Sequence, residues 1–203
     1  MANERVSARE ATLRLVLTAL FMALNIVFSS SVMSIPVPGG HVYLNDAIVV
    51  IAGLLLSPYE AFAVGGIGAF LGDFFFYPAP MWVSLVTHGL QAVMISLISH
   101  RTLKKHKHAG AIVAVIVGIV INMAGYTIGR RFFYGNNPAA AMIKLPWQIL
   151  QASVGSALGA VLVMSKGLPA LIRKTMGLRL WDAEKHPAPE PEAEPAAPED
   201  GTE

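Results

Sequence analysis

The sequence predicts an all-α integral membrane protein with six transmembrane helices. Hydrophobic residues make up 54% of its 203 residues and charged residues only 14%, so a soluble domain could not solvate the resulting surface. The apolar residues form runs that approach the roughly 20 residues a helix needs to cross the bilayer hydrocarbon. The chain contains no cysteine, which excludes disulfides, thiolate metal sites and a cysteine nucleophile.

Each predicted helix corresponds to one apolar run. Four runs are expected to cross the membrane directly, and they cover residues 13–30, 81–99, 109–129 and 147–164. The segment between the first two is interrupted by the sequence SPYE, so we expect two shorter helices there, at residues 45–56 and 59–76. The first of these is too short to cross alone without tilt or local thinning of the bilayer.

The distribution of basic residues predicts that both termini lie in the cytoplasm. In that orientation twelve Lys and Arg residues face the inside, and only Arg130, Arg131 and Lys144 face the outside. Membrane topology and contact with anionic lipid therefore explain the positive charge better than nucleic-acid binding does. Residues 1–180 are predicted to form the membrane domain. Residues 181–203 are acidic and proline-rich, and we expect a disordered cytoplasmic tail.

Polar side chains are concentrated in the half of each span that this orientation places outside. Asn122, Tyr126 and Arg130 are spaced four residues apart, so they form one stripe along the outer half of the fifth span. The inner halves hold almost only Ala, Val, Ile, Leu and Gly. Uncompensated polar groups are costly in hydrocarbon, and ionisable ones mark binding sites or pathways.

This one-sided polarity predicts an outward-facing binding chamber with a dry floor. A channel or a symmetric transporter would need polar lining on both sides of the membrane. We therefore expect a small molecule to be bound by the polar residues of the outer half, which are Asp73, His88, Gln91, Asn122, Tyr126, Arg130, Gln148 and Gln151.

The segment SIPVPGGHV, residues 34–42, is predicted to be a lid over this chamber. Pro36 and Pro38 stiffen the segment, whereas Gly39 and Gly40 allow it to bend. A loop of this length can order over a bound ligand.

Asn45 and Asp46 follow the lid and open the second helix. A carboxylate at this position can satisfy free backbone N–H groups and complement the helix dipole. Asp46 is therefore interpreted as a helix cap rather than as a ligand group.

Four of the candidate residues allow two interpretations. Asp73 can bind a ligand or form an ion pair with Arg130 or Arg131. Arg130 can bind an anion or lie solvated at the rim. His88 and Gln91 can contact a ligand or form a hydrogen bond that holds helices together.

Other motifs argue against further chemistry. Gly65, Gly68 and Gly72 do not fit the G-x-G-x-x-G nucleotide fingerprint, and we interpret them as a face for close helix packing. The histidines of HRTLKKHKH, residues 100–108, indicate a basic cytoplasmic loop, and no metal site is predicted. No G-x-x-x-x-G-K-[ST] motif occurs, so we expect no ATP hydrolysis by that route.

The order of several short motifs resembles the substrate-binding S components of energy-coupling factor (ECF) transporters, most closely the riboflavin-type and hydroxymethylpyrimidine-type branch. The similarity covers about residues 11–166 and is densest in YLNDAIVVIAGLLLSPYEAFAVGGIGAFLGDFFFYPAPMWVSLVTHGLQ. The matching positions are Ala19, Ala23, Asn45, Asp46, Gly65, Gly66, Gly68, Asp73, Tyr77, Pro78 and His88. His88 stands where many relatives have lysine, which leaves the substrate open.

The resemblance implies that the chain captures a water-soluble vitamin or precursor, such as pantothenate, a pyridoxine-like compound, hydroxymethylpyrimidine or riboflavin. It also implies docking through Ala19 and Ala23 onto a transmembrane coupling protein that carries two ATPases. ATP would be used by those partners, so this chain would need no cofactor and would not be an enzyme. Arg130 would suit a carboxylate or phosphate on the ligand.

Two alternatives come from other classes of protein. A structural membrane subunit would use the polar groups only to hold helices together and would bind no ligand. An intramembrane enzyme would use Asp73 and His88 as acid and base, and the isolated chain would then turn over a substrate.

Overall fold

The fold is known from a computed structural model, which describes residues 8–38, 40–102, 107–133, 138–178 and 180. Helices account for 85% of these residues, so the prediction of an all-α membrane protein is confirmed in its main feature. The predicted tail, residues 181–203, lies outside the described residues. In chain order the elements are α1 (Ala8–Phe28), η1 (Ser31–Met33), β1 (Ile35–Val37), β2 (Gly40–Val42), α2 (Asn45–Leu55), α3 (Pro58–Phe62), the π-helical η2 (Ala63–Ile67), α4 (Gly68–Phe76), α5 (Met81–Leu97), the π-helical η3 (Ile98–Thr102), α6 (Lys107–Phe132), α7 (Pro138–Met164) and α8 (Gly167–Met176).

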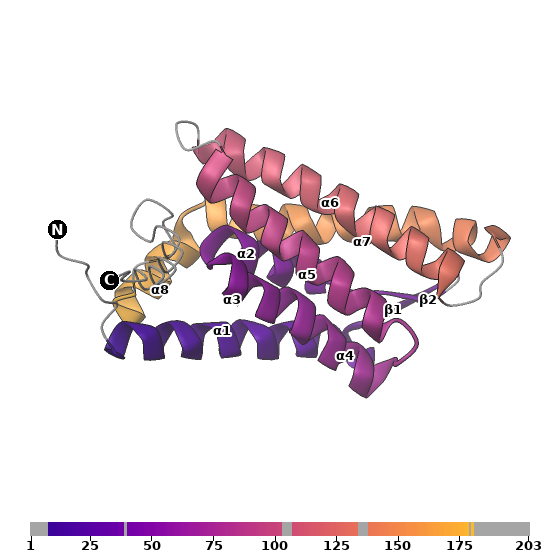
Figure 1. Ribbon diagram of the computed structural model, residues 1–203, viewed down its shortest axis with the longest axis horizontal. Helices are drawn as coiled ribbons and strands as arrows, with labels where there is room; N and C mark the ends of the chain where they lie inside the picture. Colours follow the sequence, from indigo (N-terminus) through magenta and orange to yellow (C-terminus); the bar gives the residue numbers. More distant parts are fainter. Residues whose placement is uncertain (1–7, 39, 103–106, 134–137, 179, 181–203) are drawn as a thin grey trace, which may run out of the picture.

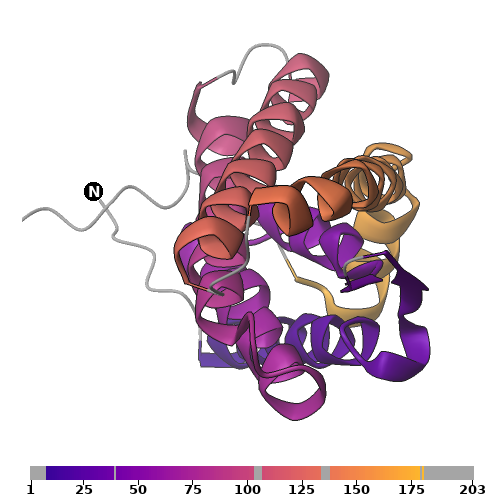
Figure 2. The ribbon, with the colours of Figure 1, turned by 90° about the vertical axis from the view of Figure 1, so that its right-hand side faces the viewer.

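Five long helical stretches in the described part of the chain are apolar enough to cross a membrane. They cover residues 8–28, 58–76, 81–101, 108–132 and 142–164. Large apolar side chains are exposed along all of them, as expected where lipid is the solvent. Figure 1 shows α1 and α6 on opposite sides of the bundle, and the end-on view of Figure 2 agrees.

The sixth predicted span corresponds to α2, which has only eleven residues and lies at the centre of the bundle. It is roughly 17 Å long, against about 30 Å of hydrocarbon. All eleven of its residues are buried. Because the neighbouring helices enclose it, its length does not have to match the bilayer, and a full crossing by α2 stays a prediction.

The predicted break at the sequence SPYE is confirmed, and a capping box explains it. The Ser57 side chain accepts a hydrogen bond from the Glu60 backbone N–H, while the Glu60 carboxylate accepts from the Ser57 N–H at 2.8 Å. Pro58 occupies the first turn, where its missing N–H costs nothing. The chain therefore ends α2 and starts a new span within three residues.

The predicted small-residue packing face on the next span is also confirmed. A Cβ atom at Gly65 would lie 2.7 Å from the His88 carbonyl oxygen, and one at Gly68 would lie 2.9 Å from Asn25 Nδ2. A Cβ at Gly72 would lie 2.6 Å from the Cβ of Ser29, one residue after α1 ends. The span formed by α3, η2 and α4 thus packs its backbone against side chains at the end of α1 on one side and against the backbone of α5 on the other.

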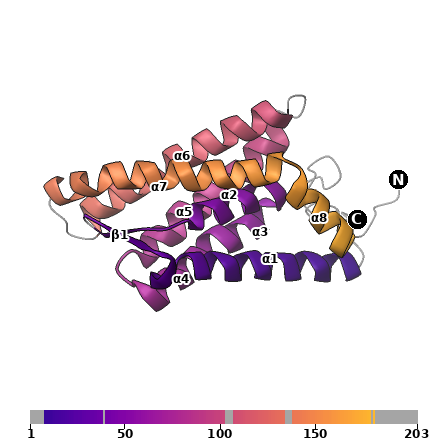
Figure 3. The same ribbon diagram turned by 180° about the vertical axis from the view of Figure 1, so that it is seen from behind.

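A short amphipathic helix, α8, ends the described chain and was not predicted. Ile172 is buried in an apolar cluster with Leu17 and Phe21 of α1, whereas Arg173 and Lys174 are exposed. In Figures 1 and 3, α8 and the start of α1 lie at the end of the molecule opposite the β1–β2 hairpin. With only ten residues, α8 carries too short an apolar stripe to stand out beside the long spans.

The centre of the bundle below α2's first turn is apolar. Val50, Leu54, Ile95, Ala114 and Val115 form one buried cluster that joins α2, α5 and α6. This packing matches the dry floor that the sequence predicts.

We expect Gly159→Ala to lower the melting temperature of the detergent-solubilised protein. A Cβ at position 159 would lie 2.4 Å from the carbonyl oxygen of Ala47, where α7 crosses α2. Overpacking of this kind typically costs about 1–3 kcal/mol. Gly167→Ala is a matched control, because its Cβ would meet only Ser165 Oγ at 3.8 Å. Equal losses in the two variants would contradict the tight crossing.

Candidate functional site

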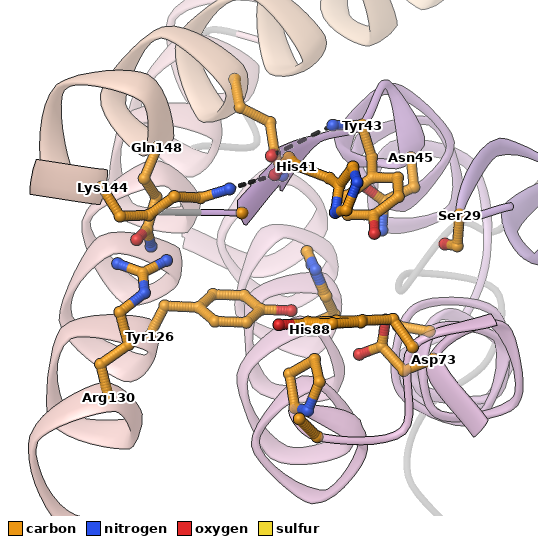
Figure 4. Close-up of a pocket in the computed structure, with 16 residues that line it drawn as sticks. Ser29, His41, Tyr43, Asn45, Asp73, His88, Tyr126, Arg130, Lys144 and Gln148 are labelled. Carbon is orange, nitrogen blue, oxygen red and sulfur yellow. Dashed lines mark hydrogen bonds between the residues drawn. The ribbon is translucent and has the colours of Figure 1, made fainter. Parts of the chain in front are cut away.

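A cavity of about 210 Å³ opens at the hairpin end of the bundle. Its walls come from α4, α5, α6 and α7, and the β1–β2 hairpin contributes Gly40 and His41 (Figure 4). Six of the eight predicted ligand-binding residues line it: Asp73, His88, Tyr126, Arg130, Gln148 and Gln151. That these residues contact a ligand stays a prediction.

The other two predicted residues, Gln91 and Asn122, do not line the cavity. Both are fully buried, and each is hydrogen-bonded to a residue that does line the cavity. Gln91 Oε1 accepts a hydrogen bond from His88 Nδ1 at 2.9 Å, because an amide oxygen cannot donate. The backbone oxygen and Oδ1 of Asn122 accept from Gln148 Nε2 at 3.3 and 3.4 Å.

Asp46 is the centre of this buried layer. Its Oδ1 accepts from Asn122 Nδ2 at 2.9 Å and from Gln91 Nε2 at 3.3 Å, and its Oδ2 accepts from Gln151 Nε2 at 3.0 Å. The N-cap residue of α2 is Leu44, and no side chain caps this helix. The interpretation of Asp46 as a helix cap is therefore wrong, because its carboxylate pairs with amides of three other helices.

Asp73 belongs to a second chain of hydrogen bonds along the cavity wall. Its carboxylate accepts from the Ser84 hydroxyl, and the same hydroxyl lies 2.6 Å from the Tyr126 hydroxyl. The Tyr126 ring meets the His88 ring edge-on, with 5.5 Å between centroids. Among the described residues no arginine lies within ion-pair distance of Asp73, so the predicted alternative of an ion pair with Arg130 or Arg131 is not observed.

Two cationic side chains face the cavity from neighbouring helices, as Figure 4 shows. Arg130 of α6 is only 8% exposed, and its guanidinium carbon lies 5.9 Å from the centre of the Tyr126 ring. This burial excludes the interpretation of Arg130 as a solvated rim residue. Lys144 of α7 is 7% exposed and donates a hydrogen bond to the His41 carbonyl oxygen, which fastens the hairpin to α7.

Sequence reasoning placed residues 34–42 over the chamber, but it missed that they pair as a hairpin and that His41 and Tyr43 line the cavity. Strands β1 and β2 pair antiparallel, with Pro36 opposite His41, and Gly40 adopts a φ of +144° that favours glycine. The Tyr43 N–H donates to Gln151 Oε1 at 3.2 Å. Burial, followed by the charges of Asp73 and Tyr77, raises the pKa of Tyr43 to about 12, so its hydroxyl stays protonated at physiological pH.

Three polar atoms of cavity-lining residues are buried without a hydrogen-bond partner: His41 Nδ1, Asn45 Oδ1 and Gln148 Oε1. Asn45 and Gln148 are 4% and 2% exposed. Unpaired buried polar atoms cost free energy, and each calls for an explanation such as a binding role. Within the described ranges no group of three or more acidic or histidine side chains could hold a metal ion.

The predicted docking residues lie elsewhere, on the outer surface of α1. Ala19 and Ala23 are one turn apart and both exposed, whereas Phe21 and Asn25 point into the bundle. A helix face with such small side chains allows close approach of another helix.

Two comparisons with known proteins bear on this arrangement. A family model described as ECF-type riboflavin transporter, S component, matches residues 9–168. UPF0397 proteins from Streptococcus agalactiae serotypes Ia, V and III are each 25% identical to the chain over 135 residues. These alignments cover 63% of this chain and 74% of each relative.

We expect Asn122→Leu to reduce stability by about 1–3 kcal/mol, because it removes a donor to Asp46 and the acceptor of Gln148 inside the membrane. Thermal unfolding in detergent measures the effect. Thr127→Val on the same helix is the control, since Thr127 is exposed and bonds only to its own helix at Met123. A smaller loss in Asn122→Leu than in the control would contradict the buried network.

Proposed function

The chain belongs to the family of ECF-type riboflavin transporter S components, and on this premise we propose that its cavity captures a small water-soluble vitamin or precursor that carries an acidic group. Membership of this family supports the role of a substrate-binding membrane subunit of an ECF importer, and it supports binding rather than turnover.

One observation carries the proposal, namely a cavity that is lined by polar side chains, opens at the hairpin end and has an apolar floor. Many of the buried polar side chains line this cavity or bond to residues that do, and the centre of the bundle beneath it is filled by the apolar cluster around Val50 and Ile95. A buried binding site explains this arrangement, whereas a through-going pore does not. Asn45 Oδ1 and Gln148 Oε1 are buried acceptors of cavity-lining residues without a partner, and a bound ligand could supply one.

The chemistry and size of the cavity favour some vitamins over others. Arg130 and Lys144 give one side of the cavity a positive charge, which suits a carboxylate or phosphate. The volume of about 210 Å³ lies below the roughly 300–1,000 Å³ typical of pockets for drug-sized ligands. Pantothenate or a phosphorylated pyridoxine-like compound therefore ranks first, ahead of hydroxymethylpyrimidine, and riboflavin ranks last because of its three-ring system.

The rest of the proposal concerns topology and partners. The cavity opens to the outside of the plasma membrane, both termini lie in the cytoplasm, and the β1–β2 hairpin acts as the lid. Ala19 and Ala23 form the contact with a transmembrane coupling protein, whose two ATPases use the ATP. The exposure of both alanines on one face of α1 supports this contact.

Titration calorimetry of the purified protein in detergent tests ligand capture with five probes: pantothenate, pyridoxine, pyridoxal phosphate, hydroxymethylpyrimidine and riboflavin. We expect one molecule of an acidic probe to bind per chain, and Arg130→Gln to weaken that binding by about tenfold or more. Arg131→Gln is the matched control, because the adjacent Arg131 is exposed. Binding of no probe, or equal effects of the two variants, would count against the proposal.

We expect the double variant Ala19→Phe, Ala23→Phe to lose copurification with the coupling protein and its ATPases while its ligand affinity is unchanged. The bulky rings would prevent close approach of the partner helix. Val120→Phe serves as the control, because Val120 is 59% exposed on a different helix, α6. Intact complexes with the double variant would argue that docking uses another surface.

A further inference from the structure

The Asp46 carboxylate restricts how the side-chain amides around it can be oriented. Both of its oxygens accept hydrogen bonds, Oδ1 from Asn122 and Gln91 and Oδ2 from Gln151. An amide side chain has a donating end and an accepting end, and only its NH₂ end can face an accepting oxygen. All three amides are therefore locked with their NH₂ groups toward Asp46.

The orientation of the Asn122 side chain also fixes that of Gln148, a residue of the cavity wall. With its Nδ2 on Asp46, Asn122 must present Oδ1 on its other side, where Gln148 Nε2 lies 3.4 Å away. The Asn122 backbone oxygen, 3.3 Å from the same nitrogen, also needs a donor there. The NH₂ end of Gln148 is thus fixed, and its Oε1 is the buried oxygen that has no partner.

We propose that the buried Asp46 sets the polarity of the cavity wall through Asn122, so that Gln148 presents an accepting oxygen to the ligand and the ligand presents an N–H or O–H group there. This inference rests on the proposed function, since it describes how the proposed ligand is recognised. Asp46 does not line the cavity, so it is a positioning residue that acts through two amides.

The same wall places a cation beside this acceptor. Lys144 and Gln148 both line the cavity and are four residues apart on α7, so their Cβ atoms are about 5–6 Å apart on one face of the helix. Asn45 Oδ1 is a second buried acceptor without a partner. The ligand class that fits is a small acid that also carries a hydroxyl, amino or amide donor near its acidic group.

Pairs of matched probes test whether Gln148 presents an accepting oxygen to the ligand. Pantothenate and pyridoxal phosphate are each compared with an analogue in which one hydroxyl is replaced by fluorine, and hydroxymethylpyrimidine with one in which methyl replaces the amino group. These replacements keep the size but remove a donor. For the probe that the wild type binds, the parent compound should bind at least tenfold more tightly than one of its analogues.

Asp46→Asn is the decisive variant, because it leaves the cavity-lining residues in place. Without an acceptor-only group at position 46, Asn122 can reverse and turn its Nδ2 toward Gln148. Only the Asn122 backbone oxygen then favours the present orientation of Gln148, so the preference for the parent should fall below about threefold. Gln148→Met should lose the preference as well. Ser156→Ala, on α7 and outside the cavity, should keep it. A folded Asp46→Asn variant with the wild-type preference would overturn the proposal.

A relocated carboxylate provides a rescue. In the double variant Asp46→Asn, Asn122→Asp, the new carboxylate at position 122 again holds Gln148 Nε2, so the preference for the parent should return. Without any ligand, the double variant should also melt above the lower of the two single variants, because one carboxylate again faces the amides.

The ligand preference and the melting temperatures together separate the proposal of ligand capture from the proposal that Asp46 orients the amides. If no probe binds the wild type, the proposed function fails, and the melting temperatures still decide whether Asp46 orients the amides. Probes could instead bind while neither the preference for the parent compound nor the melting temperature is coupled between positions 46 and 122. The proposal that Asp46 orients Gln148 through Asn122 is then wrong, and ligand capture stands.

Discussion

The hydrogen bonds around Asp46 are the interaction on which the rest of the structure depends. A carboxylate inside a bilayer is stable only if other protein groups replace the water it has lost. Asp46 is fully buried, and amide donors from α5, α6 and α7 meet its two oxygens. One side chain at the start of α2 thereby ties together three long helices. The cavity lies directly above this group of hydrogen bonds, so these bonds set the positions of the residues in its walls.

The short central helix follows from the same constraint. Because α2 is enclosed by other helices, it can place Asp46 in the interior of the bundle and end after eleven residues, just before the Ser57 capping box. Its apolar remainder packs against Ile95 and Val115 and closes the floor of the cavity. Hydrogen bonds from Lys144 to His41 of the β1–β2 hairpin and from Tyr43 to Gln151 attach this segment to α7, where it lines the open end of the cavity. Among the described residues, polar groups thus surround a cavity that has an apolar floor.

Periodicity and position along each span predict much of this from the sequence. The break before Pro58, the glycine face at Gly65 and Gly68, and the gathering of polar groups at one end all depend on local pattern, and the structure has them. Asp46 was misinterpreted because capping is a local rule, whereas its amide partners are 45 to 105 residues away. Lys144 was assigned to the outside because the last apolar run begins at residue 147, yet α7 begins at Pro138 and continues through Pro146.

The central claim is that this chain holds one small molecule in the cavity above Asp46. Native mass spectrometry of the protein, released from detergent after purification from its expressing cells, tests that claim most directly. The account predicts a population heavier than the apoprotein by the mass of one vitamin-sized acid, which is freed when the protein is denatured. A single apoprotein mass, unchanged after incubation with a mixture of water-soluble vitamins, would contradict it.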